Sequence, residues 1–294
     1  MKQEPKAPAR RSRWGQARRL EFIDVRLRWD GRLNRSDLTE FFDISVPQAS
    51  LDLAGYAQQA PANLRYDASS KSYVATESFR PIFAAEEPQR YLYDLMAINT
   101  GVLKEDQIFL GWLPNFDSVP MLDRGLDSRI FFPLIRAIRE RAALRVSYQS
   151  MSHDDADYRT ISPHALAFDG FRWHVRAYCH ARLDYRDFVI ARILEISAVD
   201  EVPISGDQDE KWHQVITLVL APNPLLSEAQ QRAIARDYGM EAGVTQCGCR
   251  RSLLFYALRR LGLAGSAAEN KKSQQLVLAN RDEIQMYLDE IATS

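Results

Sequence analysis

The chain has 294 residues, of which 46% are hydrophobic and 26% charged, and its formal net charge is −1. This is the composition of an ordinary globular protein with two or three domains. The sequence contains no apolar run near the roughly 18–20 residues that a membrane span needs, no apolar signal-peptide core behind its basic N-terminus, and too few cysteines for a disulfide framework. We therefore expect a cytoplasmic protein without a membrane partner.

The small net charge hides an uneven distribution along the chain. Residues 1–35 contain eleven Lys or Arg against four Asp or Glu, whereas residues 36–80 contain three against six. An N-terminal arm this basic suits a polyanion, because Lys and Arg displace counterions from phosphates. A solvated tail that only improves solubility is the alternative.

The N-terminal third of the sequence predicts two helices in quick succession. Apolar residues at helical spacing follow Trp14, and Gly31 ends the pattern. Ser36 is expected to cap a short second helix over residues 37–42, and Asp43-Ile44 forms a turn after it.

A third helix is predicted by Ser45-Val46-Pro47-Gln48. Ser at the N-cap with Gln three residues later forms a capping box, and Pro is tolerated in the first turn of a helix. The pattern places Ala49, Leu53 and Tyr56 on the inner face of this helix. It places Gln48, Ser50 and Asp52 on the outer face.

The short segments 64–66 and 72–74 flank the polar stretch DASSK and predict a two-stranded hairpin. Three helices followed by a hairpin indicate a winged helix-turn-helix, in which the third helix enters the major groove of DNA. A three-helix interaction module is the alternative. The outer face of the third helix carries no Arg or Lys, so phosphate contacts must come from elsewhere. The candidate DNA-binding residues are Arg35, Ser45, Gln48, Ser50, Arg65 and Lys71.

The sequence changes to a period of two at Leu144, after a predominantly helical connector. Strands are predicted over 144–150, 159–168, 171–179 and 185–196, and Asp169-Gly170 is a strong hairpin signal. Four or five short antiparallel strands favour a small barrel or a strongly bent sheet. The alternation concentrates Arg, His and Tyr side chains on one face of the third and fourth strands.

Such a face suits an anionic or nucleotide-like ligand, because Arg binds phosphate and aromatic rings stack on bases. A solvated face with salt bridges to Asp184, Asp187 and Glu195 is the alternative.

The β-rich segment resembles a WYL domain, an Sm-like β-barrel found in bacterial ligand-responsive transcription regulators. The resemblance is carried by Tyr148, Arg159, Pro163, Trp173-His174-Val175, Tyr178-Cys179, Tyr185-Arg186-Asp187-Phe188 and Ala191-Arg192-Ile193. With a winged helix-turn-helix before it and a small α/β region after it, the whole chain resembles the WYL repressors of phage-defence islands, the BrxR/CapW group. The name motif differs here, because His174 and Val175 stand where the family has Tyr and Leu.

The resemblance implies a nucleotide or oligonucleotide effector that is bound by the WYL domain. The candidate ligand-binding residues are Tyr148, Arg159, His174, Arg176, Arg186 and Arg192. Substitution of Arg186 or Arg192 by Ala should then spare DNA binding and abolish the response to the effector.

The C-terminal third predicts a β-α-β-α-β-α order with strands near 212–220, 241–246 and 274–278 and helices that begin at Ser227, Arg250 and Arg281. This order indicates a small α/β sandwich, to which the resemblance assigns dimerisation. The expected fold is therefore multidomain α+β. Its predicted domains are a winged helix-turn-helix with a basic arm (1–85), a helical connector (86–143), a WYL barrel (144–203) and a dimerisation domain (204–294).

No catalytic constellation stands out in the sequence. The chain lacks a P-loop, a Gly-rich dinucleotide fingerprint and a nucleophile elbow. Cys247-Gly248-Cys249 with only Cys179 left does not make a four-ligand zinc site, so we expect no metal and no cofactor, with redox sensing by the pair as the alternative. A nuclease using Asp154, Asp155 and Asp157 is the enzymatic alternative.

We predict a homodimeric, sequence-specific transcription repressor of a phage-defence operon, bound to a double-stranded palindromic operator and associated with the nucleoid. The alternatives are an activator and a nucleic-acid-binding accessory protein of a defence system.

Overall fold

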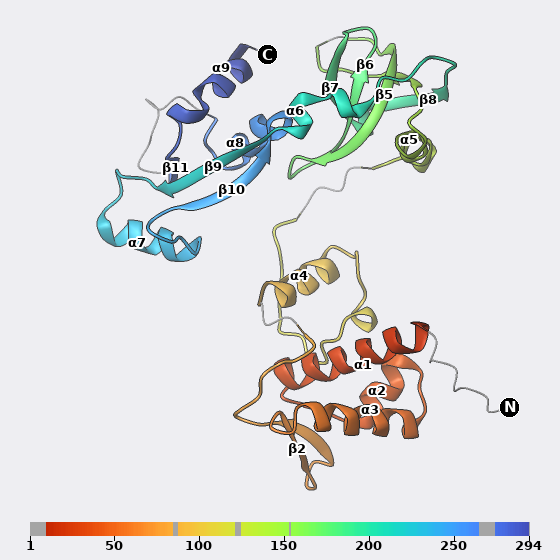
Figure 1. Cartoon of the computed structure of the whole chain (residues 1–294), viewed down its shortest axis with the longest axis vertical. Helices are drawn as coiled ribbons and strands as arrows, with labels where there is room; N and C mark the ends of the chain where they lie inside the picture. Colours follow the sequence, from red (N-terminus) through yellow and green to blue (C-terminus); the bar gives the residue numbers. More distant parts are fainter. Residues whose placement is uncertain (1–9, 85–87, 121–124, 153, 265–273, 294) are drawn as a thin grey trace, which may run out of the picture. The chain divides into compact units, whose positions relative to one another are not determined.

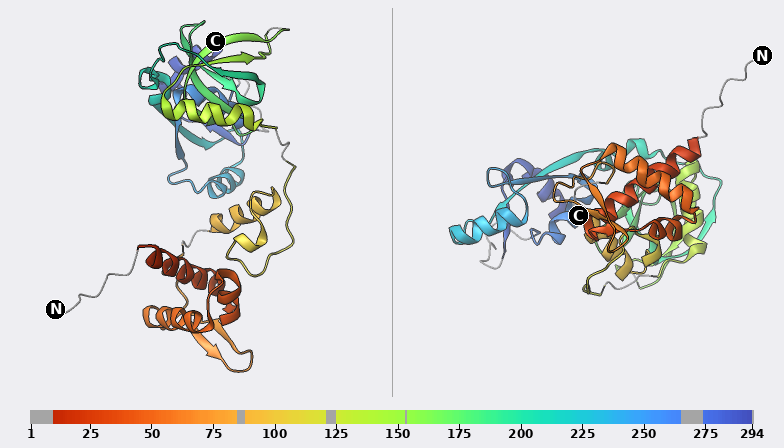
Figure 2. Two further views of the ribbon diagram at one scale, coloured as in Figure 1. Left: turned by 90° about the vertical axis from the view of Figure 1, so that its right-hand side faces the viewer. Right: turned by 90° about the horizontal axis from the view of Figure 1, so that it is seen from below.

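The computed structural model describes residues 10–84, 88–120, 125–152, 154–264 and 274–293, without the side chains of 10–14 and 292–293 (Figures 1 and 2). The chain divides into two compact units, Met1–Leu122 and Asp123–Ser294. The first nine residues of the basic N-terminal arm predicted from the sequence lie outside the described residues. In the described part of the chain, no helix is both long and apolar enough to cross a membrane.

The first unit begins with three helices and a small antiparallel sheet of strand order β1-β3-β2 (Figure 1). The elements are α1 (Arg10–Trp29), β1 (Arg32–Leu33), α2 (Arg35–Phe42), α3 (Val46–Gln59), β2 (Leu64–Asp67) and β3 (Ser72–Ala75). The predicted hairpin is thus confirmed as β2 and β3. Strand β1, which pairs with β3 through Arg32 and Leu33, has no counterpart among the predicted elements.

The caps of α2 and α3 explain where these helices begin. Helix α2 starts two residues earlier than predicted, because Asn34 and not Ser36 is its N-cap. The Asp37 carboxylate accepts the Asn34 N–H at 2.5 Å. The Ser45 N-cap of α3 is confirmed, since Ser45 Oγ accepts the Gln48 N–H at 3.4 Å, but the Gln48 side chain binds Asp52 at 3.1 Å in place of completing the predicted capping box. Asp43 joins the two helices with a left-handed φ of 50°.

The core of the first unit lies between its three helices. Ala49, Leu53 and Tyr56 of α3 are buried, as predicted. A later segment of the chain completes this core: the Phe109 ring packs on Phe22 at a centroid distance of 5.4 Å. The same segment is hydrogen-bonded to α1, because the Asp30 carboxylate accepts the N–H groups of residues 111 and 112 at 2.9 and 3.2 Å.

Helix α4 (Pro88–Asn99) and the short 3₁₀ turn Glu105–Gln107 precede that segment. The Tyr91 ring of α4 packs on Trp29 of α1 at 4.5 Å. The first part of the predicted connector therefore belongs to the first unit.

The second unit opens with α5 and a five-stranded antiparallel sheet of order β7-β6-β5-β4-β8. The elements are α5 (Ser128–Glu140), β4 (Leu144–Tyr148), β5 (Asp157–Phe168), β6 (Trp173–Cys179), β7 (Asp184–Val189) and β8 (Ile193–Ala198). A 3₁₀ turn, Ile190–Arg192, divides the predicted fourth strand into β7 and β8. In the described residues β7 and β8 are not paired with each other, so the predicted barrel is not closed and the sheet is open.

Helix α5 covers one face of this sheet, as Figure 2 shows. Its Ile130, Leu134 and Ala137 enter the same core as Val175 and Phe188 of the sheet. Val175, Ala177 and Cys179 of β6 therefore define the core side of the sheet.

The C-terminal elements form a second antiparallel sheet of order β10-β9-β11 with helices packed on it (Figure 1). They are α6 (Glu210–His213), β9 (Val215–Pro222), α7 (Glu228–Asp237), β10 (Thr245–Arg250), α8 (Leu254–Arg260), β11 (Leu276–Leu278) and α9 (Gln285–Thr293). The predicted β-α-β-α-β-α order from β9 onward is found. Ile234 of α7, Leu254 of α8 and Leu218 of β9 share one core.

Candidate functional site

The first candidate site is the exposed surface of α3 in the first unit. Val46 and Leu51 are 56% and 67% exposed, and Pro47 and Ala54 are exposed beside them. The Ser50 hydroxyl donates to the Val46 carbonyl at 3.0 Å and is thereby bound to its own helix. The outward surface of α3 is therefore mainly apolar.

Asp52 was predicted on this outer face, but its side chain is fully buried. Its carboxylate accepts a hydrogen bond from Arg19 Nε at 2.6 Å and one from Gln48 Nε2 at 3.1 Å. The ion pair with α1 explains why an acidic side chain can enter the core, since a buried charge must be paired. Asp52 in turn fixes the orientation of the Gln48 amide.

The three candidate phosphate contacts surround α3 in the sequence and are all exposed. Arg35 lies in the first turn of α2, Arg65 on β2 and Lys71 in the turn between β2 and β3. Exposed cations on a wing and beside a helix can hold a DNA backbone without reading its sequence. Ser45, another of the six predicted DNA-binding residues, is the N-cap of α3, and its side chain accepts a hydrogen bond from the Gln48 N–H.

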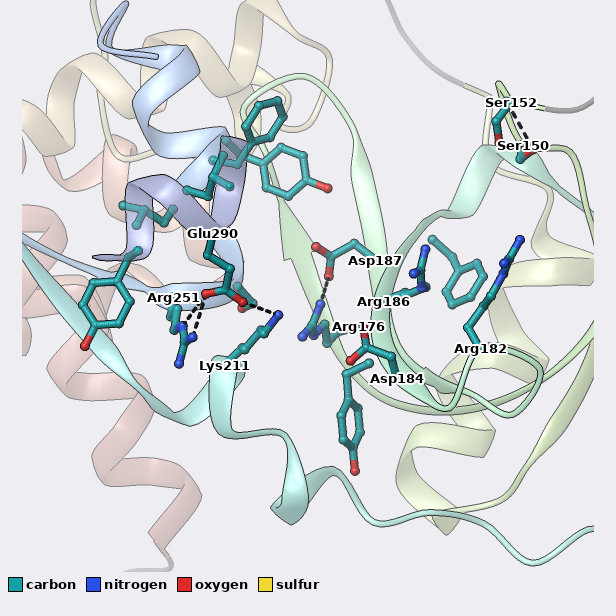
Figure 3. Close-up of a pocket in the computed structure, with 18 of the residues that line it drawn as sticks. Ser150, Ser152, Arg176, Arg182, Asp184, Arg186, Asp187, Lys211, Arg251 and Glu290 are labelled. Carbon is teal, nitrogen blue, oxygen red and sulfur yellow. Dashed lines mark hydrogen bonds and ion pairs between the residues drawn. The ribbon is translucent and has the colours of Figure 1, made fainter. Parts of the chain in front are cut away.

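The second candidate site is a cavity of about 750 Å³ in the second unit (Figure 3). Four of the predicted ligand-binding residues line it, namely Tyr148, Arg159, Arg176 and Arg186. His174 and Arg192 do not line it. The cavity reaches around β7, an edge strand of the five-stranded sheet.

The sheet register divides the predicted Arg/His/Tyr face between its two sides. Arg176 pairs across β6 and β7 with Asp187, and Ala177 pairs with Arg186. Because directly paired residues share a side, Arg186 lies on the core side with Ala177, and Arg176 lies on the opposite side. The expectation of one shared cationic face was therefore wrong.

Arg176 is the centre of a buried ion network. Its Nε and Nη2 bind the two oxygens of Asp209 at 2.7 and 3.1 Å, and its Nη1 binds Asp187 at 3.3 Å. Burial alone would raise the pKa of Asp209, but hydrogen bonds from His164 and Arg176 hold it well below its usual range. Burial raises the pKa of Asp187 despite the nearby Arg176. Arg176 is thus already neutralised by carboxylates.

His174 has a structural position next to this network. Its Nε2 lies 2.9 Å from Asp169 Oδ2, and its ring packs on Tyr256 of α8 at 5.0 Å. Burial would raise the pKa of Asp169, yet hydrogen bonds from His174, Arg172 and the backbone hold it well below its usual range. His174 therefore joins the sheet to the C-terminal helices rather than facing the cavity.

The cavity has cationic groups that the sequence did not single out. Lys211 and Arg251 both bind Glu290 of α9 at 2.6 Å, as Figure 3 shows. Hydrogen bonds from Lys211 and Arg251 lower the pKa of Glu290. In the described part of the chain, the exposed Arg182 and Arg186 that line the same cavity have no ion pair. Among the described lining residues, these two guanidinium groups therefore carry positive charge without a carboxylate partner.

No sequence signal marked Lys211, Arg251 or Glu290, because each stands alone in its own segment and they meet only through the fold. Arg182 was not predicted as a site residue because it lies in the turn before β7, and the alternation of side chains assigns faces only to residues within strands.

The predictions about metal and redox chemistry concern the Asp154–Asp157 segment and the cysteine pair of β10. The described ranges contain no group of three or more His, Cys, Asp or Glu residues arranged for a metal ion. Cys247 is exposed and Cys249 partly buried on β10, and burial raises the pKa of Cys249 to about 11. His153, which directly precedes the candidate nuclease residues Asp154 and Asp155, lies outside the described residues.

Comparisons with known families cover most of the chain. Three family models match: the BrxR transcriptional regulator winged helix-turn-helix domain at residues 15–97, the WYL domain at residues 129–198 and the BrxR transcriptional regulator C-terminal dimerization domain at residues 215–284.

Three relatives are each described as a DNA-binding transcriptional repressor CapW. The protein from Stenotrophomonas maltophilia is 45% identical over 95% of this chain and 94% of its own. The Pseudomonas aeruginosa protein is 47% identical over 93% of this chain and 92% of its own. The protein of Escherichia coli strain KTE188 is 44% identical over 98% and 96%. With all three domains matched in order and similarity along nearly its whole length, the chain belongs to the BrxR/CapW family of WYL-domain transcription regulators.

Proposed function

We propose that this protein is a homodimeric transcription repressor that binds a palindromic DNA operator. The observation that carries the proposal is the winged helix of the first unit, whose capped helix α3 exposes its outward surface between cationic neighbours. The 44–47% identity to proteins described as DNA-binding transcriptional repressors supports the sign of regulation. A member of a regulator family needs no catalytic site, so the nuclease alternative is set aside.

Dimerisation is supported by the match of residues 215–284 to a dimerization domain. One winged helix contacts few base pairs, and a two-fold dimer reads two half-sites spaced by about 34–36 Å or a multiple of it. In this proposal residues 1–85 read DNA, 144–203 sense the effector and 204–294 dimerise. The connector, 86–143, contributes α4 to the first unit and α5 to the second.

We further propose an anionic, nucleotide-like effector at the cavity of the second unit. Arg182 and Arg186 supply guanidinium groups that have no ion pair within the described residues, and Tyr148, Phe255 and Tyr256 line the same cavity with rings. Guanidinium groups bind phosphate with paired hydrogen bonds, and rings stack on bases. The effector changes operator binding only as far as its affinity differs between the two states of the dimer.

Replacement of Arg186 by Ala is expected to spare operator binding and weaken the response to the effector by about tenfold to a hundredfold, which is the loss of one charged hydrogen bond. The measurement is release of labelled operator DNA during titration with nucleoside monophosphates, cyclic dinucleotides and short single-stranded oligonucleotides. Arg192→Ala is the matched control, because Arg192 does not line the cavity. Equal responses of the Arg186→Ala and wild-type proteins to the active compound would contradict this site.

The proposed target is the protein's own defence operon, which places the protein at the nucleoid. A reporter gene under the upstream DNA tests the sign of regulation: the repressor proposal predicts low expression with the protein and high expression without it. Higher expression with the protein would support the activator. No change, together with DNA binding that ignores sequence, would support the accessory protein.

A further inference from the structure

The first two turns of α3 offer few hydrogen-bonding groups to a base edge beside Gln48, since the exposed Gln58 and Gln59 lie in its last turn. Val46, Pro47, Leu51 and Ala54 are exposed and apolar, and the Ser50 hydroxyl donates to its own helix. Leu51 is the largest of them and is 67% exposed. A protein that reads sequence through this helix must use apolar contact for part of its specificity.

Only one base offers an apolar group in the major groove. Thymine carries a methyl group at C5, whereas the major-groove edges of the other bases present hydrogen-bond donors and acceptors. We propose that Leu51, which has Pro47 one turn before it on the same face of α3, determines operator specificity by contacting thymine methyl groups. This inference rests on the proposed repressor function and names the base that the α3 surface recognises.

Gln48 supports the same base-pair preference from the neighbouring side of α3. One N–H of its amide is held by Asp52 at 3.1 Å, and Arg19 holds Asp52 in place at 2.6 Å. The remaining N–H and the carbonyl oxygen of Gln48 match the N7 acceptor and N6 donor of adenine. Gln48 and Leu51 together therefore favour A·T base pairs.

The charges around α3 favour DNA over a protein partner for this apolar surface. The only acidic side chain of α3, Asp52, is buried in its pair with Arg19. The exposed residues on the neighbouring elements include the cations Arg35, Arg65 and Lys71, together with the acidic Glu40, Asp43 and Glu77. An apolar helix surface without an exposed carboxylate of its own can approach the methyl groups of a major groove, while the cations of α2 and the wing supply phosphate contacts.

The test uses the full-length protein and two versions of the operator defined by footprinting on the DNA upstream of its own gene. One version has thymine and the other deoxyuridine, which differs only by the missing methyl group. Wild type should bind the deoxyuridine version about fourfold more weakly for each contacted methyl, the factor that burial of one such group gives. With one contact in each half-site the dimer loses about fifteenfold. Fluorescence anisotropy measures both affinities.

Leu51→Ala should bind thymine DNA more weakly by a similar factor and lose the difference between the two versions. Leu194→Ala, another exposed leucine 57% exposed in the second unit, is the matched control and should behave as wild type. Equal binding of wild type to both versions overturns the inference, and so does an unchanged deoxyuridine penalty in Leu51→Ala. A change of oligomeric state in Leu51→Ala, with its DNA discrimination retained, would show instead that this surface binds protein.

The wild-type comparison needs no variant, so the inference stays testable even when Leu51→Ala folds poorly. Failure of the proposed function is a separate outcome. In that case wild type does not distinguish the upstream DNA from scrambled DNA of equal length, whichever pyrimidine it contains.

Discussion

Replacement of Arg176 by Met is expected to lower the free energy of unfolding of the second unit by about 3–5 kcal/mol, the cost of leaving buried charges unpaired. The side chains of Arg176 and Asp209 are 5% and 1% exposed, so water cannot replace the lost partner. Asp187, whose pKa burial already raises, loses its cationic neighbour in this variant as well. Chemical denaturation followed by circular dichroism measures the change.

Arg186→Met is the matched control, because Arg186 is exposed on the neighbouring strand and has no ion pair in the described structure. Its effect should stay within about 0.5 kcal/mol. An Arg176→Met/Asp209→Leu double variant should recover part of the loss, since it removes one of the stranded charges. Equal stability of Arg176→Met and Arg186→Met would contradict a structural role for the network.

Acidification gives this prediction a second readout. The folded pKa of Asp209 lies below its unfolded value of about 3.9, so its contribution to stability is present above that pH and lost as pH falls toward the folded pKa. In Arg176→Met, protonation of Asp187 and Asp209 removes their buried negative charges and with them the cost of leaving those charges unpaired. The stability difference between the two proteins should therefore be largest near neutral pH and shrink below about pH 4. A difference that grows on acidification would exclude this cause.

Replacement of Asp24 by Ala should lower the free energy of unfolding of the first unit by about 3–5 kcal/mol, because it leaves several buried donors without an acceptor. Asp24 is fully buried on α1, and its Oδ2 accepts the N–H groups of Ile82, Phe83 and Ala84 at 2.7, 2.5 and 3.0 Å. Its Oδ1 accepts the hydroxyl of Tyr56 on α3. One carboxylate therefore joins α1, the recognition helix and the chain that follows the wing.

Amide hydrogen exchange of the full-length protein measures the loss of stability that Asp24→Ala causes in the first unit. The amides of residues 82–84 should lose protection, and operator affinity should fall with the stability of the winged helix. Asp24→Asn should have a smaller effect, since its oxygen can still accept hydrogen bonds but lacks the charge. Glu40→Ala, an exposed acidic residue of α2, serves as the control. Unchanged protection in Asp24→Ala would show that these hydrogen bonds contribute little.

The elements that local signals define were predicted well. Ser45 with Gln48 marked the start of α3, and helical spacing placed Leu53 and Tyr56 in the core. The N-cap of α2 is Asn34 and not Ser36, because the Asp37 carboxylate accepts the Asn34 N–H and so starts the helix at Arg35. A cap prediction from one residue type is therefore accurate only to within about two residues.

Features that depend on contacts between residues far apart in the chain could not be predicted from the sequence. Nothing near Phe109 indicates that it packs on Phe22, since the contact joins segments far apart in the chain. Asp52 looked like an outward residue because helical spacing alone cannot show that Arg19 lies opposite to pair with it.

The cavity illustrates the same limit for a site. Alternation within each strand was read correctly, but the faces of β6 and β7 could be matched only with their register, which sets Arg176 against Asp187. A shift of one residue exchanges the sides of every residue on a strand. Half of the cavity comes from Lys211, Arg251 and the helices after them, which no strand pattern could bring to Arg186.

Sequence-specific operator binding is tested most directly by a gel-shift titration of the full-length protein on the DNA upstream of its own gene. Scrambled DNA of equal length is the control, and both titrations are done at two salt concentrations. A dimeric, sequence-specific repressor is expected to bind the upstream fragment alone tightly, with two-fold symmetric protection in a footprint. Equal binding to both fragments that falls steeply with salt would contradict it, since that is the behaviour of phosphate contacts without sequence readout.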